Sequence, residues 1–207
     1  MDTVRLPKAT KARLILLLQV LKTWKEPKIT SVQIEEITGW KDSLIRHDFW
    51  LLKFAGGVSN GYLVNELEEK IRQALGIKTL IEKEEKKKCC IVGLGRFGTA
   101  LLDESFIDES NFIIKAGFDS NVNRVEILHS TFPLYPANEI QFVVKKEKIE
   151  YAILTVPQKE VAIMCERLTK AGIKGIVNMT DSVLTVPKNI KVENLSIKNA
   201  LNMLISE

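Results

Sequence analysis

The chain has 207 residues, a formal net charge of +4 and 45% hydrophobic residues. This length allows one large or two small domains, and the apolar fraction supports a buried core. The sequence shows no signal peptide, transmembrane run, lipidation motif, internal repeat or low-complexity tract. These patterns exclude secreted, membrane and repeat classes, so we expect a cytoplasmic protein without a membrane partner.

The positions of charged residues and cysteines bear on two further questions, whether the protein binds nucleic acid and whether it binds a metal. The first 28 residues carry 7 basic and 2 acidic residues, which suits a phosphate backbone, although a solvated basic helix face explains charge alone equally well. Cys89 and Cys90 are adjacent in an apolar run and Cys165 stands far away, so they lack the spacing of metal ligands. We expect reduced structural thiols and no metal site.

The first regular pattern predicts two helices. Leucines recur at helical spacing over residues 8–24, and Pro27 lies beyond the end. Thr30 and Gln33 have the spacing of a capping box for a second helix, which Gly39 would end.

A third helix is predicted from Asp42, its expected cap, to about Lys53. Helical spacing turns Ile45, Phe49 and Leu52 toward a core. The side chains that it turns outward are Ser43, Arg46, His47 and Trp50.

Glycines and Asn60 in residues 55–62 then indicate a hairpin tip. Asn65 and Glu68 have the spacing of a second capping box, which predicts a fourth helix ending near Gly76. Three helices, a hairpin and another helix form the layout of a winged helix-turn-helix. In that layout the third helix enters the major groove of DNA.

After a stretch rich in Lys and Glu, the pattern becomes an alternation of strands and helices. This alternation predicts a doubly wound parallel sheet, and thus an α/β fold for this part of the chain. The expected strands are 89–92, 112–118, 132–135, 151–156, 175–179 and 190–193. The expected helices are 96–104, 138–148, for which Asn138 and Gln141 suggest a capping box, and 158–171.

The first strand of this sheet runs into Gly93-Leu94-Gly95-Arg96-Phe97-Gly98. A G-x-G-x-x-G between a strand and a helix is the fingerprint of a dinucleotide-binding turn. Asp119 follows the next apolar strand, at about the distance where a carboxylate accepts the ribose hydroxyls of NAD. A glycine turn kept only for helix–sheet packing is the plainer alternative.

The chain closes with an amphipathic helix over residues 195–205, which no further strand follows. We therefore predict four parts: a winged-helix DNA-binding domain, a linker, a Rossmann dinucleotide-binding domain and a C-terminal dimerisation helix. Their expected bounds are 1–77, 78–87, 88–193 and 194–207.

This order of parts resembles the Rex family of redox-sensing transcriptional repressors over nearly the whole chain. The most specific similarities are Ile153-Leu154-Thr155-Val156-Pro157 and Ala171-Gly172-Ile173-Lys174-Gly175-Ile176-Val177-Asn178. Further ones are Leu6-Pro7-Lys8-Ala9-Thr10, Ile45-Arg46-His47-Asp48-Phe49, Gly61-Tyr62, Phe118-Asp119, Val186-Pro187 and Glu193-Asn194-Leu195.

The resemblance implies a homodimeric repressor, not an enzyme, that exchanges its C-terminal helices and releases a palindromic operator when NADH binds. Gly93, Gly95, Arg96, Phe97 and Gly98 would hold the pyrophosphate. Asp119 would bind the adenosine ribose, Asn178 would lie near the nicotinamide, and Thr155, Val156 and Pro157 would line the cleft. The residues expected to contact double-stranded DNA are Lys8, Arg13, Ser43, Arg46, His47, Lys53, Asn60 and Tyr62.

Several positions depart from the family pattern. Gln19, Glu104 and Ser196 stand where the family tends to place Arg, Tyr and Asp, and Asp181 also differs near the nicotinamide. Gly57-Val58 replaces the usual basic pair of the wing. These departures leave open a Rex-like regulator that senses another adenine nucleotide or CoA. A second alternative, from another class, is an NAD-dependent oxidoreductase with an appended winged helix.

Overall fold

The computed structural model describes residues 6–54, 61–77, 86–108 and 110–206. Contacts divide the chain into two compact units, residues 1–82 and 83–207. Each unit is described by itself below. Most of the predicted linker, residues 78–87, lies outside the described residues, and the predicted domain bounds stay a prediction.

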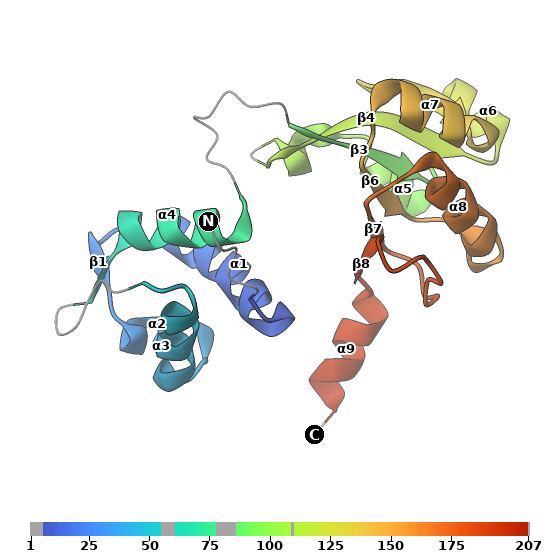
Figure 1. The fold of residues 1–207 in the computed structure, drawn as a ribbon. Coiled ribbons are helices and arrows are strands. Elements are labelled where there is room, and N and C mark those ends of the chain that lie inside the picture. The colour runs from blue at the N-terminus through green and yellow to red at the C-terminus, as the bar shows by residue number, and fades with distance from the viewer. Residues whose placement is uncertain (1–5, 55–60, 78–85, 109, 207) are drawn as a thin grey trace. The chain divides into compact units, whose positions relative to one another are not determined.

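The first unit is a small helical domain with one strand pair (Figure 1). Leucines of α1 pack with Ile34, Ile45, Phe49 and Ile71 into one apolar core, as the helical spacing predicted. The strands β1 and β2 pair antiparallel. The elements are α1 (Lys8–Thr23), β1 (Lys28–Ile29), α2 (Ser31–Thr38), α3 (Asp42–Leu51), β2 (Tyr62–Leu63) and α4 (Val64–Leu75).

Of the three helix caps predicted in this unit, the structure confirms one and contradicts two. The Thr30–Gln33 capping box is present, and α2 ends at Gly39 with φ +72°. Asp42 was wrongly predicted as a cap: it is the first residue of α3, and its amide donates instead to the Glu35 carboxylate (3.0 Å). The predicted cap at Asn65 is wrong too, because α4 begins one residue earlier at Val64. The Val64 amide donates to the Pro27 carbonyl (3.0 Å).

The second unit is an α/β domain around one parallel sheet of order β5-β4-β3-β6-β7-β8. This confirms the predicted doubly wound fold, since the order reverses between β3 and β6. Its strands are β3 (Lys87–Val92), β4 (Phe112–Asp119), β5 (Leu134–Pro136), β6 (Tyr151–Leu154), β7 (Gly175–Asn178) and β8 (Lys191–Asn194). Its helices are α5 (Arg96–Ala100), η1 (Glu104–Ile107), α6 (Val122–Ile127), η2 (Ala137–Glu139), α7 (Ile140–Glu147), α8 (Gln158–Ala171) and α9 (Ile197–Ile205).

Alternate residues of the central strand β3 face opposite sides of the sheet. Cys90 and Val92 pack in the cluster that includes α7 and α8. Cys89 and Ile91 pack on the other side with Leu102 after α5. The three cysteines are buried and form no disulfide. Burial raises the pKa of Cys90 and Cys165, so both thiols stay protonated, as expected of structural thiols.

Three local predictions in this unit need correction. The helix after the glycine turn ends at Ala100 instead of residue 104, because Asp103 accepts the Ser105 amide (3.0 Å) and starts the separate 3₁₀ turn η1. Asn138 caps no helix and lies inside η2. The short helix α6 was not predicted; Asn121 caps it by accepting the Asn123 amide.

In the described part of the chain, no helix has the length and apolar character needed to cross a bilayer. Likewise, no three His, Cys, Asp or Glu side chains of the described residues gather where they could hold a metal ion.

Candidate functional site

The glycine turn follows β3 directly and leads into α5. Gly93 has φ +99°, and a Cβ there would lie 2.8 Å from Val156 Cγ1, while a Cβ on Gly98 would lie 1.7 Å from the Gly93 carbonyl oxygen. These two glycines are therefore required for the turn and for helix–strand packing. Gly95 differs, because no atom lies within 4 Å of its Cβ position. Its backbone is open to a ligand, which is the role of the second glycine in the fingerprint.

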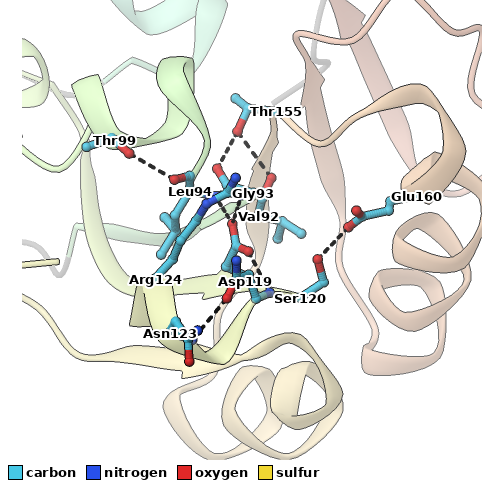
Figure 2. A network of polar contacts seen from close by, with 11 residues as sticks. Val92, Gly93, Leu94, Thr99, Asp119, Ser120, Asn123, Arg124, Thr155 and Glu160 are labelled. Atoms are coloured by element: carbon cyan, nitrogen blue, oxygen red, sulfur yellow. Dashed lines mark hydrogen bonds and ion pairs between the residues drawn. The ribbon is translucent and has the colours of Figure 1, made fainter. Parts of the chain in front are cut away.

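Asp119 ends β4 beside this turn and is only 3% exposed (Figure 2). Its Oδ2 accepts the Leu94 amide (2.6 Å) and its Oδ1 accepts the Asn121 amide (2.7 Å). Arg124 Nη1 lies 3.4 Å from Oδ2. The carboxylate thus ties the glycine turn to the end of β4, and since each carboxylate oxygen accepts two hydrogen bonds, it retains acceptor capacity for a ligand.

Thr155, which follows β6, holds the glycine turn in place through hydrogen bonds on the side opposite to Asp119. The Thr155 amide donates to the Val92 carbonyl (2.9 Å), and the Thr155 hydroxyl donates to the Gly93 carbonyl (2.6 Å). On the first turn of α8, Glu160 accepts the Ser120 hydroxyl (2.8 Å), which connects the end of β4 with α8 (Figure 2).

These loops enclose a cavity of about 630 Å³ at the carboxyl edge of the sheet, where the strand order reverses. That volume lies within the usual range for small-molecule and cofactor sites. The wall contains these predicted cofactor residues: Gly93, Gly95, Arg96, Phe97, Asp119, Thr155, Val156 and Pro157. It also contains Asp181 and Ser196, two of the positions that depart from the family pattern. Further wall residues were not selected by sequence reasoning as ligand contacts: Ser120, Arg124, Gln158, Glu160, Met179, Thr180, Leu195, Ile197 and Lys198.

Asn178 stands behind the wall and is only 1% exposed. Its amide nitrogen donates to the Ser182 carbonyl (2.8 Å) and to Asn194 Oδ1 (2.9 Å), and its amide oxygen accepts from the Thr180 backbone and hydroxyl (3.1 and 2.7 Å). These four bonds shape the loop that places Met179 to Asp181 on the wall. Direct contact between Asn178 and a ligand stays a prediction.

In the first unit, α3 presents its predicted outward face. Ile45 and Phe49 are buried, whereas Ser43, Arg46, His47 and Trp50 are exposed. Arg46 is paired with Asp42 one turn earlier, and its side chain is 59% exposed. This face therefore combines a cation, hydroxyl and imidazole groups and an indole on one side of the helix.

Arg13, expected to contact DNA, is engaged inside the first unit. Its Nε lies 2.6 Å from Oδ2 of Asp48 and its Nη2 donates to Oδ1 (2.8 Å), while the Thr10 hydroxyl also donates to Oδ1 (2.9 Å). The Asp48 carboxylate raises the pKa of Arg13. Since Asp48 is buried, this pair ties α1 to α3, and a DNA contact by Arg13 stays a prediction.

The other predicted DNA residues have varied surroundings. Tyr62 packs its ring against Phe49 (4.7 Å between centroids), and burial raises the pKa of its hydroxyl. Lys53 is exposed, with φ +52° just after α3, and Lys8 is exposed in the first turn of α1. Asn60 and the wing residues Gly57 and Val58 lie outside the described residues.

The helix α9 follows β8 and extends away from the sheet (Figure 1). No residue of α9 that the structure describes is buried. Leu201, Leu204 and Ile205 share one side of the helix and are 59%, 82% and 81% exposed. Such an apolar helix is typical of an interaction surface.

Three positions that depart from the family pattern have different surroundings. Ser196 caps α9 by accepting the Asn199 amide (3.3 Å), and Gln19 is exposed on α1. The side chain of Glu104 lies outside the described part.

Comparison with known proteins supplies an independent line of evidence. A family model for the CoA binding domain matches residues 84–182. The redox-sensing transcriptional repressor Rex of Limosilactobacillus reuteri (strain DSM 20016) is 31% identical over 208 residues, covering 99% of this chain and 94% of that protein. The Rex of Listeria welshimeri is 30% identical, with coverage of 99% and 94%.

Solved structures agree in fold. The crystal structure of RSP, a Rex-family repressor, matches 97% of this chain and 93% of that chain, with a TM-score of 0.82 and 26% identity. RSP in complex with β-NAD⁺ and operator DNA matches 96% and 90%, with a TM-score of 0.85 and 25% identity.

Proposed function

The chain belongs to the Rex family of redox-sensing transcriptional repressors, and we propose that it binds operator DNA under the control of NADH and NAD. The observation that carries this proposal is the cavity at the strand reversal, where Gly95 faces open space beside the buried Asp119. The family assignment also disfavours the oxidoreductase alternative, because its curated members are named repressors. We assign the protein no enzymatic activity and place it in the cytoplasm.

The proposed cofactor residues lie at two ends of the cavity, one for the adenosine and pyrophosphate and one for the nicotinamide. The turn from Gly93 to Gly98 binds the pyrophosphate through backbone amides, with Arg96 and Phe97 on the wall. Asp119 accepts the hydroxyls of the adenosine ribose. The nicotinamide then lies toward β7, where Met179, Thr180 and Asp181 line the cavity and Asn178 supports their loop.

The outward face of α3 enters the major groove, and Arg46 contacts a base edge or a phosphate. Ser43 and His47 flank it on the same face. Lys8, Arg13, Lys53, Asn60 and Tyr62 complete the proposed DNA-binding set. A palindromic operator then requires two copies of this helix, and thus a dimer.

The exposed apolar side of α9 supports a homodimer in which each subunit packs this helix against its partner. Apolar side chains of α9 would gain about 25 cal/mol for each Å² removed from water. The dimer also doubles the phosphate contacts, so a mild net charge suffices for DNA binding.

One specific observation favours a second candidate ligand, since the CoA binding domain model covers most of the sheet. CoA carries a phosphate on its adenosine ribose, and the Asp119 carboxylate would repel it. NADP has the same difficulty. A free ribose, as in NAD or ATP, fits Asp119 better.

Isothermal titration calorimetry of the full chain with NADH, NAD, NADP, CoA and ATP tests the ligand. A mobility shift on a duplex enriched from a random library tests the DNA. We expect NADH to bind and to reduce the shift. Binding of CoA or ATP but neither NADH nor NAD would favour the second candidate, and failure to enrich any duplex would contradict a repressor.

A further inference from the structure

The outward face of α3 carries one large side chain to which the functional proposal gives no role. Trp50 is 71% exposed, whereas its neighbour Phe49 is 2% exposed. Residues i, i+3, i+4 and i+7 share one side of a helix, and Ser43, Arg46, His47 and Trp50 have this spacing. Around the helix axis Trp50 therefore lies between Arg46 and His47, and along the axis it is the last but one residue of α3.

Contacts within the helix hold the indole in place. The rings of His47 and Trp50 are stacked, with centroids 5.8 Å apart and planes inclined by 18°. Arg46, on the other side, is drawn toward Asp42. The indole is thus supported as a flat apolar surface, and an ordered side chain loses less entropy when it binds.

We propose that Trp50 recognises thymine in the operator through the 5-methyl group, with His47 as the residue that positions the indole. The inference rests on the proposed function, because it requires α3 to lie in the major groove. Among the four base edges exposed there, only thymine presents an apolar group. An indole offers a large apolar surface and one N–H donor, so it fits a methyl group better than it fits the acceptors of guanine.

The residues around Trp50 favour DNA over a protein partner. Arg46, Ser43 and His47 supply a cation and hydrogen-bonding groups that suit phosphates and base edges. Among the described residues, they place polar groups on the same face of α3 as the indole, which suits a nucleic acid better than an apolar protein surface. Trp50 carries no charge, so it contributes to base recognition and little to the salt dependence.

Uracil tests this assignment, because it differs from thymine only in lacking the 5-methyl group. A duplex is enriched from a random library by the wild-type protein, and each thymine is then replaced singly by uracil. Dissociation constants are measured at fixed salt for the wild type and Trp50→Ala. A buried carbon contributes about 0.8 kcal/mol, so wild type should lose about fourfold in affinity at a thymine that Trp50 contacts. Replacing both symmetry-related thymines should cost about fifteenfold.

Trp50→Ala should bind the thymine duplex more weakly and lose nothing further with uracil. Ile127→Ala is the matched control, because Ile127 is 70% exposed but lies on α6 of the other unit, and it should behave as wild type. His47→Phe keeps a ring beneath the indole and should preserve the thymine-to-uracil ratio, whereas His47→Ala should reduce it. Unchanged circular dichroism and urea unfolding show that each variant is folded, because NADH binding reports only on the other unit.

Three results would overturn the inference. The first is that wild type tolerates uracil at every position, and the second is that Trp50→Ala keeps the wild-type ratio. The third is that Trp50→Gln keeps this ratio when Trp50→Ala does not fold. Each leaves the proposed function intact, because the enriched duplex still binds. If no duplex is enriched, the proposed function and this inference both fail.

Discussion

Asp119→Asn tests the geometry of the cofactor site most directly. The substitution keeps the size of the side chain but removes its charge and replaces one acceptor oxygen with a donor. In the structure both oxygens accept backbone amides, at 2.6 Å from Leu94 and 2.7 Å from Asn121. The variant retains one of these bonds and loses the other, and a hydrogen bond to a charged group contributes about 1.5–3 kcal/mol. We expect the free energy of unfolding to fall by that amount.

The effect on ligands separates the ribose contact from the effect on the turn. Loss of a charged acceptor should weaken NADH binding by about 2 kcal/mol, or roughly thirtyfold. NADPH carries a further phosphate on this ribose, which the carboxylate repels by several kcal/mol at an effective dielectric constant of about 20. The ratio of NADPH to NADH affinity should therefore rise at least tenfold, which damage to the turn alone would not produce.

Calorimetry with NADH and NADPH measures this ratio, and urea unfolding measures stability. Asp181→Asn is the control, because it removes a carboxylate from the β7 side of the same cavity. It should leave the ratio unchanged. If Asp119→Asn lowers stability but leaves the ratio at its wild-type value, Asp119 holds the turn without contacting the ribose.

Four further outcomes are expected. Arg46→Ala should weaken specific operator binding by about 1–3 kcal/mol per half-site in a mobility shift and leave NADH binding unchanged; equal shifts would exclude a groove contact. Deletion of residues 194–207 should give monomers or aggregates by light scattering, and a well-behaved dimer would contradict the role of α9. Asp48→Ala should reduce stability by about 3–5 kcal/mol in urea, because it leaves Arg13 partly buried without its carboxylate partner; a loss below 1 kcal/mol would place that pair among exposed ones. NADH and NAD affinities should differ by less than about tenfold, since Gln19 and Ser196 are neutral where the family tends to place charges. The measurement is the NADH concentration that releases half of the bound operator. If a thousandfold excess of NAD leaves this concentration unchanged, the prediction is wrong.

The sequence predicted most of what periodicity and glycine chemistry determine. The leucines of α1, the Thr30–Gln33 box and the turn at Gly93–Gly98 depend on neighbours close in the chain, and the structure has them as predicted. The cap predictions at Asp42 and Asn65 failed because distant groups satisfy the helix amides: the Glu35 carboxylate does so for α3, and the Pro27 carbonyl does so for α4.

The cavity wall also contains residues that the sequence could not predict, because their roles depend on groups distant in the chain. Glu160 and Arg124 have no motif around them, and their role arises only when parallel strands bring the loops after β4 and β6 together. One signal was present for Arg124, since it lies five residues after Asp119 on a short helix that Asn121 caps. The pair of Arg13 with the buried Asp48 shows the same limit, because it joins two residues that are far apart in the chain, and a DNA contact by Arg13 stays a prediction.

The cavity and α9 are continuous, and this continuity bears on how a ligand can act. Leu195, Ser196, Ile197 and Lys198 line the cavity, and the last two are already the first residues of α9. A ligand that fills the cavity therefore contacts the residues from which the exposed apolar helix starts. A ligand shifts a conformational equilibrium only through contacts that differ between two states. Because Ser196 caps α9 through the Asn199 amide, a change at this cap alters the start of the helix that we assign to the dimer. In the dimer that we propose, ligand state and subunit arrangement would thus be linked through one short segment, and substitutions at Ser196 should change both together.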